Sequence, residues 1–560
     1  MYVRTVRSKT KEGIVEYVQL CHNYRDPVAK RSKTEVLFNF GRADSIDVDA
    51  IRRLIKSLSR LLPQEEAEAI QFGSGNDESL TFLGSRELGG TWLLDGMWKR
   101  LEIDQTIKNL LSKRNYGIPI ERLLFAMVAN RALAPSSKLY LGHWVAKEAF
   151  IEDLPEVEVH QLYTAMDLLV EANEDIQHDI FVSVANLFNL EGDVIFLDTT
   201  TTYFEIENED EDTEQEEGLR KRGHNKDNHP ELPQVVIAFA VTRDGIPVRC
   251  WVWPGNTSDQ DLLKEVKKDL NSWKLGKVMM VQDTGFNLPA NRHILQSGGD
   301  HYIIGEKMRL GPNGKPPEAL GKKGRYKKLD NGLEAKGSIE GGDGEVRRRF
   351  IIVRNPKEAK RDRIKRENIV SEVTRRLEEI KQMEGEPHKK ATCDLRSHKT
   401  FGRYVRQTKI GKLCLDKAKI RIEEHLDGKY LLSTSDDGLP IEDVVAGYKQ
   451  LVTIERVFRD IKHTIDIRPV YHRLSERIKA HVLLCWIAIL LIRIIEREMD
   501  ETWFQIKKIF SSIKLGIYEL PSGTVTQSSK LNSDQKRLFK AVNVKLPPQY
   551  FNLKTPEIKK

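Results

Sequence analysis

The stretch Val194–Glu205, VIFLDTTTTYFE, decides how the rest of the chain is interpreted. Four apolar residues lead directly into Asp198, and four threonines follow it. A short apolar run continued by β-branched residues predicts a buried strand. A bare carboxylate at the end of such a strand is costly unless something pairs with it. The stretch therefore poses the question of which group pairs with Asp198.

Strands and helices alternate after Asp198. Two further strands are joined at RDG, a hairpin signal, and the next helix has Ser258 or Asp259 placed as its cap. In order, the expected segments are QVVIAFAVT, IPVRCWVW, the helix SDQDLLKEVKKDLN, the strand KVMMVQDTG, the helix LPANRHILQS and the strand DHYIIGEK. The sequence therefore predicts the order β-β-β-α-β-α-β.

A second carboxylate, Asp283, ends the fourth strand of this series. After a three-stranded meander, right-handed α crossovers can lay the fourth strand parallel beside the first. Asp198 and Asp283 then meet at the edge where open α/β sheets bind ligands. Two adjacent carboxylates resist joint ionisation, and Mg²⁺, which prefers carboxylate, water and phosphate oxygens, relieves that repulsion. For either aspartate alone, the alternative is a turn or capping residue.

A third carboxylate comes from the stretch YKQLVTIERVFRDIK. Tyr448, Glu455 and Lys462 are seven residues apart, so on a helix they form one stripe. Glu455 lies at the rim of a neighbouring apolar face, where it can reach the edge of a sheet. The alternative is a surface Glu–Lys pair on an amphipathic helix, which is the usual explanation of such spacing alone.

Together these residues resemble the DDE transposases of bacterial and archaeal insertion sequences. One group of them has a Y-x2-R-x3-E-x6-K signature on the helix that bears the glutamate. Tyr448, Glu455 and Lys462 match this signature, whereas Leu451 stands at its arginine position. Three other stretches also resemble this family: RGHNKDNHPELPQVV around 223–236, WPGNTSD at 253–259 and IRPVYHRLSERIKAHVLL at 467–484. The resemblance covers about residues 190–500 and extends more loosely to the N-terminal part.

The resemblance implies an α/β catalytic core with a ribonuclease H-like fold. It implies that Asp198 bridges two Mg²⁺ ions, for which Mn²⁺ can substitute, and that Asp283 and Glu455 complete one site each. One metal activates the attacking oxygen and the other stabilises the leaving oxygen of an in-line displacement. Water is the first nucleophile, and the 3′-OH that it frees then attacks target DNA. No serine or cysteine nucleophile is expected.

The resemblance also implies DNA contacts. Tyr448 and Lys462 would hold phosphates near the cleaved end, and Arg459 or Arg456 could replace the arginine missing at Leu451. A basic cluster follows the acidic run at 205–217 and is a second candidate for DNA contact, namely Arg220, Lys221, Arg222, His224 and Lys226. The alternative for this cluster is charge balance against the acidic run.

Composition and periodicity divide the chain further. We expect an N-terminal segment of strands plus a helix at 1–75, a helical DNA-binding region at 76–190, and the first part of the core at 191–309. A basic, β-rich inserted module is expected at 310–430, with RRRFIIVR and KAKIRIEE as strands around a charged helix. The second part of the core, with the glutamate helix, is expected at 431–500 and a mixed tail at 501–560.

The composition bounds the class of protein. The chain has 560 residues, 31% of them charged, and a net charge of +7, which tolerates a polyanion without proving one. Five scattered cysteines suggest neither a metal site nor a disulfide framework. The longest apolar run, Val482–Ile492, is shorter than the ~20 residues of a membrane span. The cysteine usage fits a reducing cytoplasm. The resemblance implies a prokaryotic, nucleoid-associated protein that binds terminal inverted repeats and target DNA as a homodimer.

Three alternatives remain open at this stage. A hydrolysis-only nuclease on the same fold would cleave DNA without strand transfer. An inactivated transposase would only bind DNA, although Asp198, Asp283 and Glu455 are all present. A two-carboxylate hydrolase of another class would need no metal. No P-loop motif is found, which argues against ATP-driven action.

Overall fold

The computed structural model divides into two compact units. It describes residues 2–554 apart from 11–12, 26–31, 44–45, 47–50, 52–54, 56, 58–80, 113–116, 189–193, 215–216, 225–228, 274–277, 311–315, 342–346, 452–456, 458, 461–462, 469 and 521–522. One unit is Met1–Gly84 with Ile517–Thr526 and Asn552–Lys560, and the other is Ser85–Gly516 with Gln527–Phe551.

The N-terminal strands form an antiparallel sheet in the first unit. Its strands β1 (Tyr2–Thr10), β2 (Gly13–Arg25) and β3 (Ser32–Arg42) lie in the order β1-β2-β3. Tyr2 pairs with Cys21, and two register shifts interrupt the β2–β3 ladder. The three expected strands are confirmed. The helix expected at 49–62 lies almost wholly outside the described residues.

The C-terminal residues add helices and a second small sheet. Strands β4 (Thr81–Glu87), β16 (Lys514–Leu520), β17 (Gly523–Ser528) and β18 (Tyr550–Lys554) form it in the order β18-β17-β16-β4. The helices are α17 (Trp503–Phe510) and α18 (Ser533–Ala541). Each of these two helices begins with a capping box, at Thr502 and Asn532 respectively, in which side chains satisfy free backbone N–H groups. The mixed tail therefore has regular structure of its own.

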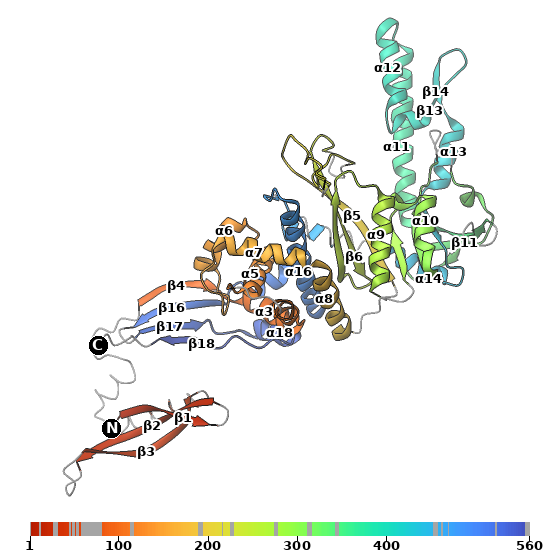
Figure 1. Ribbon diagram of the computed structural model, residues 1–560. Helices are drawn as coiled ribbons and strands as arrows, with labels where there is room; N and C mark the ends of the chain where they lie inside the picture. Colours follow the sequence, from red (N-terminus) through yellow and green to blue (C-terminus); the bar gives the residue numbers. More distant parts are fainter. Residues whose placement is uncertain are drawn as a thin grey trace. The chain divides into compact units, whose positions relative to one another are not determined.

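A nine-stranded mixed sheet organises the second unit (Figure 1), and its order is β10-β11-β12-β15-β9-β8-β5-β6-β7. Strand β5 is antiparallel to β6 and parallel to β8, and β8 is parallel to β9. The elements up to β9, in chain order, are β5 (Val194–Tyr203), β6 (Gln234–Thr242), β7 (Pro247–Pro254), α9 (Asp259–Ser272), β8 (Met279–Gln282), α10 (Pro289–Gln296) and β9 (His301–Glu306). The described elements thus follow the expected order β-β-β-α-β-α-β.

Alternate residues of β5 enter two different hydrophobic cores. Ile195 and Leu197 belong to the core that contains residues of α9 and α10, whereas Val194 and Phe196 belong to the core of the helical region. Side chains on a strand alternate between faces, so β5 is covered on both sides. This explains why its sequence is a continuous apolar run and not an alternating one.

Helix α16 (Ser475–Met499) forms the centre of the helical region. It contacts α5 (Ile120–Leu133), α7 (Val159–Glu171) and β7. By length and composition α16 could cross a membrane, but 94% of its most apolar window is buried inside the protein. It is a core helix, and it contains the apolar run Val482–Ile492. Around it lie α3 (Gly89–Arg100), α4 (Ile103–Leu111), α6 (Lys138–His143) and α8 (Asn173–Phe188).

The residues expected as a β-rich module form mainly helices, and that prediction was wrong. The described helices here are α11 (Pro356–Lys381), α12 (Gly385–Ser397) and α13 (Lys417–Leu426). KAKIRIEE, an expected strand, lies in α13 because the Asp416 side chain caps it, accepting from the backbone N–H groups of Ala418 and Lys419 at 3.1 Å each. RRRFIIVR is β12, as expected. The strands are β10 (Lys327–Lys328), β11 (Glu334–Glu340), β12 (Arg348–Arg354), β13 (Val405–Gln407), β14 (Leu413–Leu415) and β15 (Lys429–Thr434).

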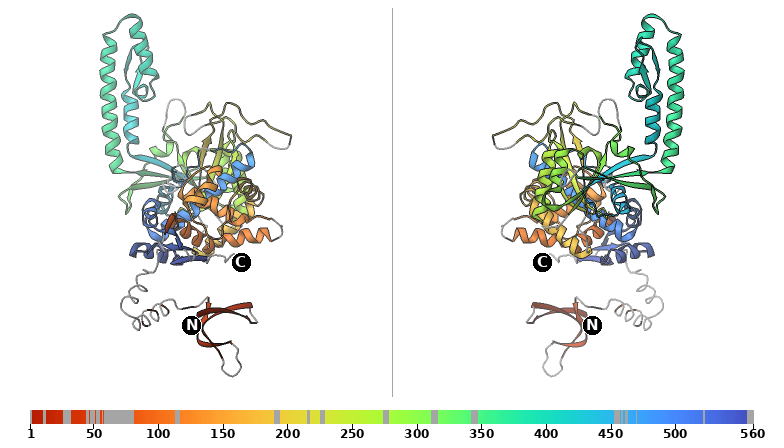
Figure 2. Two further views of the ribbon diagram at one scale, coloured as in Figure 1. Left: turned by 90° about the vertical axis from the view of Figure 1, so that its left-hand side faces the viewer. Right: turned by 90° about the vertical axis from the view of Figure 1, so that its right-hand side faces the viewer.

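The helices α11 and α12 with the β13–β14 hairpin form an arm that projects from the sheet (Figure 2). Strands β10, β11, β12 and β15 extend the nine-stranded sheet instead of building a separate one. A small core fills the arm, with Val373, Leu377 and Ile380 from α11 packed around Leu395 and Tyr404.

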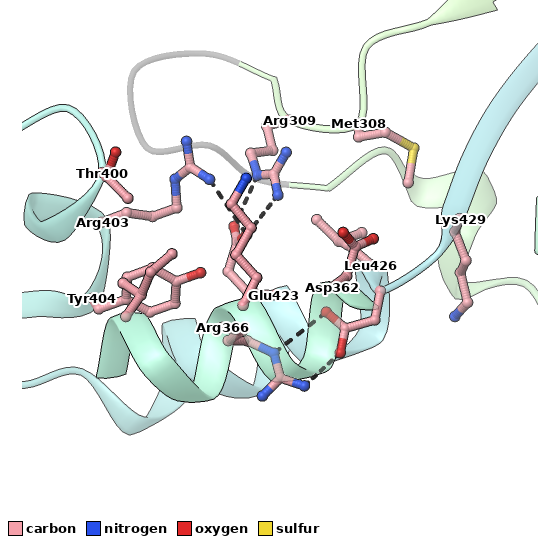
Figure 3. Close-up of a pocket in the computed structure, with 13 residues that line it drawn as sticks. Met308, Arg309, Asp362, Arg366, Thr400, Arg403, Tyr404, Glu423, Leu426 and Lys429 are labelled. Atoms are coloured by element: carbon pink, nitrogen blue, oxygen red, sulfur yellow. Dashed lines mark hydrogen bonds and ion pairs between the residues drawn. The ribbon is translucent and has the colours of Figure 1, made fainter. Parts of the chain in front are cut away.

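Ion pairs fix the base of the arm around a cavity of about 460 Å³ (Figure 3). Arg309 donates two hydrogen bonds to Glu423, at 2.8 and 2.5 Å, and Arg403 lies 3.5 Å from the same carboxylate. Arg366 on α11 pairs with Asp427. These carboxylates already have arginine partners, so the cavity is explained as a structural joint between the arm and the sheet.

Candidate active site

The pairing of β5 with β8 ends two residues before Asp198 and Asp283. The parallel ladder pairs Val194 with Met279 and ends with Phe196 opposite Val281. Asp283 keeps an extended backbone, with φ −76° and ψ 169°. The same register, continued by two residues, would place Asp198 opposite Asp283, with neighbouring strands about 4.8 Å apart. This is the relationship between the two carboxylates that the strand order predicts.

Asp198 is half-buried, and the four threonines after it are buried. Its Oδ1 accepts a hydrogen bond from the backbone N–H of Thr199 at 2.7 Å. Thr199 to Thr202 pair along their whole length with β6. The threonine run is therefore explained by strand formation and packing, which was the preferred interpretation of its sequence.

Asp283 is exposed and receives a hydrogen bond from a distant tyrosine. The Tyr448 hydroxyl, on α14 (Ile441–Lys449), donates to Asp283 Oδ1 at 3.3 Å. Burial, and next the negative charge of Asp283, raise the pKa of Tyr448 to about 12. The phenol therefore stays protonated at neutral pH and remains a donor. The structure thus joins two of the candidate residues, Tyr448 and Asp283, by a hydrogen bond.

Two residues that no sequence pattern singles out hold Tyr448 in place. Gly305 on β9 lies directly beneath its hydroxyl, and a Cβ at Gly305 would clash with the phenol and lie 2.7 Å from Thr284 Oγ1. The ring of Tyr430 on β15 stacks on that of Tyr448, with centroids 6.0 Å apart. Only the sheet order, which places β9 between β8 and β15, reveals this arrangement.

Several other candidate residues lie outside the described part of the chain. They are Glu455, Lys462 and Lys226. Arg459 is exposed on helical backbone after α14, and its neighbour Asp460 pairs with Arg493 on α16. Among the described residues, no three His, Cys, Asp or Glu side chains are grouped to hold a metal ion.

The basic cluster after the acidic run is largely engaged with that run. Arg220 pairs with Asp210 and Lys221 with Asp212, the latter at 2.7 Å. Burial tends to raise the pKa of Asp210, but its bonds to Arg220 outweigh this and hold the pKa below its usual value. The Arg222 guanidinium donates to backbone carbonyls, to that of Glu231 at 2.9 Å and to that of Glu207. His224 is exposed.

Gln234 connects two of the stretches that resemble the transposase family, the one around 223–236 and WPGNTSD at 253–259. Its side-chain amide is fully buried and donates to the carbonyl of Gly255 at 3.1 Å and to that of His224 at 3.2 Å. Gly223 and Gly255 are so close that a Cβ on either would meet the other strand's backbone. Next to them, Ser258 caps α9, with its hydroxyl accepting from the N–H of Asp261. These stretches therefore have a structural role, which agrees with the turn-and-cap interpretation of WPGNTSD.

Trp251 and Trp253 belong to the core, as their alternation with Val252 predicts. Their side chains are buried, and their rings stack with centroids 6.1 Å apart. Each indole N–H donates to a carboxylate of α9, that of Trp251 to Asp269 at 2.8 Å and that of Trp253 to Glu265 at 2.7 Å. They fasten α9 to β7 and leave no face for stacking on a base.

Two family models match the chain. Residues 193–491 match the model described as "Transposase DDE domain", and residues 3–69 match "IS1634 family transposase, N-terminal domain". The first match spans more than half of the 560 residues and contains Asp198, Asp283 and Glu455. The chain belongs to the DDE transposases. It is a DNA transposase of an insertion sequence.

Comparison with solved structures gives a distant similarity. The chain is similar to the protein in "Cryo-EM structure of piggyBac transposase synaptic complex with hairpin DNA (SNHP)", with 11% identity over 80% of this chain and 79% of that chain and a TM-score of 0.33. No curated protein matches the chain.

Proposed function

We propose that this transposase nicks the terminal inverted repeats of its own insertion sequence and joins the freed 3′ ends to target DNA. Its active site would consist of Asp198, Asp283 and Glu455. The observation that supports this most directly is the parallel β5–β8 register, which, continued by two residues, would bring two carboxylates from distant parts of the chain to one edge of the sheet. Open sheets bind their ligands at such an edge.

The proposal includes a ribonuclease H-like core. Its support is the strand order, in which β5, β6 and β7 form an antiparallel meander and β8 and β9 follow in parallel through α9 and α10. The six segments proposed from the sequence remain its outline, with the insertion at 310–430 now described as a helical arm on an extended sheet. We further propose that a homodimer holds paired ends, in the prokaryotic cytoplasm close to the nucleoid.

DDE transposases generally depend on divalent metal ions, and the two aspartates suit such an ion. Asp198 lies in the middle of β5, just beyond its ladder with β8, and Asp283 directly follows β8 and is exposed. We propose Mg²⁺, with Mn²⁺ as a substitute, held by Asp198, Asp283 and Glu455. When bound, two such ions activate the attacking oxygen and stabilise the leaving oxygen. Tyr448 holds the Asp283 carboxylate by its hydrogen bond and thus orients that ligand.

Phosphates of the DNA would lie along Tyr448, Arg459 and Lys462, beside the carboxylates. Arg222, His224 and Lys226 are proposed as a second contact. Arg222 has no ion pair among the described residues, since its guanidinium bonds go to neutral carbonyls, so its charge remains available to a phosphate. Arg220 and Lys221 are better explained as partners of the acidic run.

The test uses purified protein and a plasmid that carries the DNA flanking its gene. We expect Mg²⁺-dependent 3′-end nicking and strand transfer by the wild type, and loss of both in Asp198→Ala and Glu455→Gln. The matched control is Asp244→Asn. Asp244 lies in the β6–β7 turn, beyond the opposite end of β5, where Thr242 pairs with Ile195, and its surface pair with Arg497 is worth little.

Each other result contradicts a defined part of the proposal. Nicking without joining would favour a hydrolysis-only nuclease. Specific binding without cleavage in Mg²⁺ or Mn²⁺ would indicate an inactivated, DNA-binding-only transposase. Equal loss in Asp244→Asn would show that the effect of Asp198→Ala is not specific to the proposed site.

A further inference from the structure

A cavity of about 520 Å³ lies between α5, α6, α7 and α16, and no step of the proposed function uses it. We name it the His472 cavity. Its lining includes five basic side chains, Arg131, Lys138, Arg468, His472 and His481. Two exposed residues, Leu139 at 76% and Tyr471 at 71%, belong to the same lining, so the cavity opens to the surface. Its volume is typical of ligand sites.

Lys138 is the most unusual of these residues. It is 5% exposed, and within the described part of the chain it has no hydrogen bond or ion pair with a carboxylate. A buried lysine without a partner loses its hydration and gains nothing in return. Arg131, 4% exposed, is close enough to repel it further. A fold that keeps Lys138 here leaves a site for an anion that would neutralise it.

Two further basic groups of the lining, His481 and Arg131, each have a nitrogen without a hydrogen-bond partner among the described residues. His481 is 4% exposed; its Nε2 lies 3.2 Å from the carbonyl of Ile467, while its Nδ1 is buried without a hydrogen-bond partner among the described residues. Its ring lies 5.6 Å from that of His472. The Arg131 guanidinium donates to the carbonyls of Ser136 and Asp466, which are neutral, and its Nε has no partner in the described part of the chain. The Arg131 Nε–H is thus a donor available to a ligand, beside the Lys138 ammonium.

Among the described residues, the lining contains one carboxylate, that of Asp466, and Asp466 is exposed. The cavity therefore has a clear excess of positive charge. Such surroundings exclude a metal cation, although His472, His481 and Cys485 are neighbours, because Lys138 and Arg131 would repel it. They suit a phosphate, which offers several acceptor oxygens and negative charge together.

The cavity is linked to the strand that carries Asp198. The Arg468 guanidinium, part of its lining, lies over the ring of Tyr203 at 4.8 Å from the centroid. Tyr203 is the last residue of β5, five residues beyond Asp198, which corresponds to roughly 16 Å along a strand. One DNA strand can therefore reach the carboxylates and the cavity at once, with a separation of a few nucleotides.

We propose that the His472 cavity binds one backbone phosphate of the DNA on which this transposase acts. The proposal rests on the proposed function for the identity of the DNA. Lys138 and Arg131 supply charge and hydrogen bonds, His472 supplies a further donor, and the exposed ring of Tyr471 is available to an adjacent base, as aromatic rings are in single-strand binding sites.

The principal test compares Lys138→Met with Lys147→Met. Lys147 is exposed in the π-helical turn Trp144–Glu148, directly after α6, and serves as the matched control. The probe is a fluorescent duplex copied from the DNA that flanks the gene, titrated at several salt concentrations. We expect Lys138→Met to weaken binding about tenfold and to reduce the slope of log affinity against log salt by about one, the signature of one lost phosphate contact. Lys147→Met should change neither value.

Wild-type affinity and slope in Lys138→Met would overturn the proposal, as would an equal loss in Lys147→Met. Inorganic phosphate serves as a second probe in thermal unfolding. If phosphate stabilises the wild type and not Lys138→Met, while duplex affinity is the same in both, the cavity holds free phosphate and the DNA assignment is wrong. The nicking assay on the same wild-type preparation tests the proposed function separately from the cavity. If Lys138→Met weakens DNA binding but the wild type does not nick DNA, only the proposed function is contradicted.

Proton uptake gives a test in the wild type that does not depend on how the variant folds. Burial, together with Arg131, lowers the pKa of Lys138 to about 7, and burial lowers that of His472 to about 4. The charged or titratable groups that face Lys138 and the two histidines are Arg131, Tyr163, Asp466, Arg468, Tyr471, Arg477 and Cys485. A bound phosphate would raise the pKa of Lys138. Calorimetry of duplex binding at pH 8 in two buffers should therefore show uptake of about one proton, and no uptake would contradict the proposal.

Discussion

Tyr448 donates a hydrogen bond to Asp283 from 165 residues further along the chain. The bond joins α14 to the end of β8. Helix α14 ends at Lys449, shortly before Glu455, so the bond fixes the start of the segment that carries the proposed third carboxylate. Tyr448 thus has a structural reason to be where it is, beyond the phosphate contact that its position in the signature implies.

We predict that Tyr448→Phe lowers the rate of nicking about tenfold, a loss of about 1.4 kcal/mol, with little effect on folding. The reason is that Asp283 loses the donor that orients it, while the ring and its packing stay. The measurement is the single-turnover nicking rate in Mg²⁺, with circular dichroism as a check on folding.

The matched control is Tyr430→Phe. Tyr430 stacks on Tyr448, but its buried hydroxyl has no hydrogen-bond partner among the described residues. Its removal should leave the nicking rate unchanged. If the two variants lose the same activity, the effect comes from the packing of the ring pair and the hydrogen bond to Asp283 has no catalytic importance.

Gly305→Ala should reproduce the loss seen in Tyr448→Phe and also destabilise the protein. A Cβ at this position enters the space of the Tyr448 phenol and of Thr284 Oγ1. Overpacking of this kind costs about 1–3 kcal/mol. Nicking rates and urea midpoints check the prediction. Since Tyr448→Phe removes the hydroxyl that the new Cβ meets but leaves Thr284 Oγ1 in place, the double variant should recover part of the lost stability and none of the activity. Additive losses of stability would show that the new Cβ does not meet the hydroxyl.

The sequence predicted the part of the fold that depends on local patterns. The apolar run before Asp198, the RDG turn and the cap at Ser258 each determine local structure through neighbours in the chain, and the order β-β-β-α-β-α-β follows from them. The parallel pairing of the fourth strand with the first could be inferred as well, because right-handed crossovers restrict where the fourth strand lies.

What could not be predicted depends on partners far apart in the chain. KAKIRIEE alternates as a strand does, yet the Asp416 cap and the packing of Leu426 make it a helix. The role of Gly305 depends on Tyr448, and the burial of Lys138 depends on α5 and α16. Arg222 illustrates a different difficulty, since its contacts are backbone carbonyls, which no pattern of side chains reveals.

We predict that Glu423→Gln loosens the arm. Glu423 is 7% exposed and receives both hydrogen bonds of Arg309 and the charge of Arg403. Removal of one partner leaves the arginines unpaired, which is costly when they are buried. Because the Arg309 side chain is 37% exposed, we expect a smaller loss of about 1–2 kcal/mol. The measurement is limited proteolysis, with faster cleavage between α11 and α13.

The control for this prediction is Arg375→Gln on the exposed face of α11. Arg375 pairs with Glu372 and Glu379 within the same helix, and such surface pairs contribute little. Its proteolysis pattern should match that of the wild type. Equal sensitivity of the two variants would mean that the joint in Figure 3 does not hold the arm.

Stability should rise with pH above neutrality because of Lys138. Its pKa is about 7 in the folded protein against 10.5 in the unfolded chain. Between these values the unfolded chain binds more protons, so the free energy of unfolding increases with pH, by up to about 1.4 kcal/mol per pH unit. Below pH 7 both states are protonated and this dependence vanishes.

Urea unfolding at pH 6, 7, 8 and 9 should show the rise in the wild type and a flatter profile in Lys138→Met. Bound duplex should flatten the wild-type profile too, because a phosphate beside Lys138 restores its pKa, and an unchanged slope with duplex would argue that the His472 cavity stays empty.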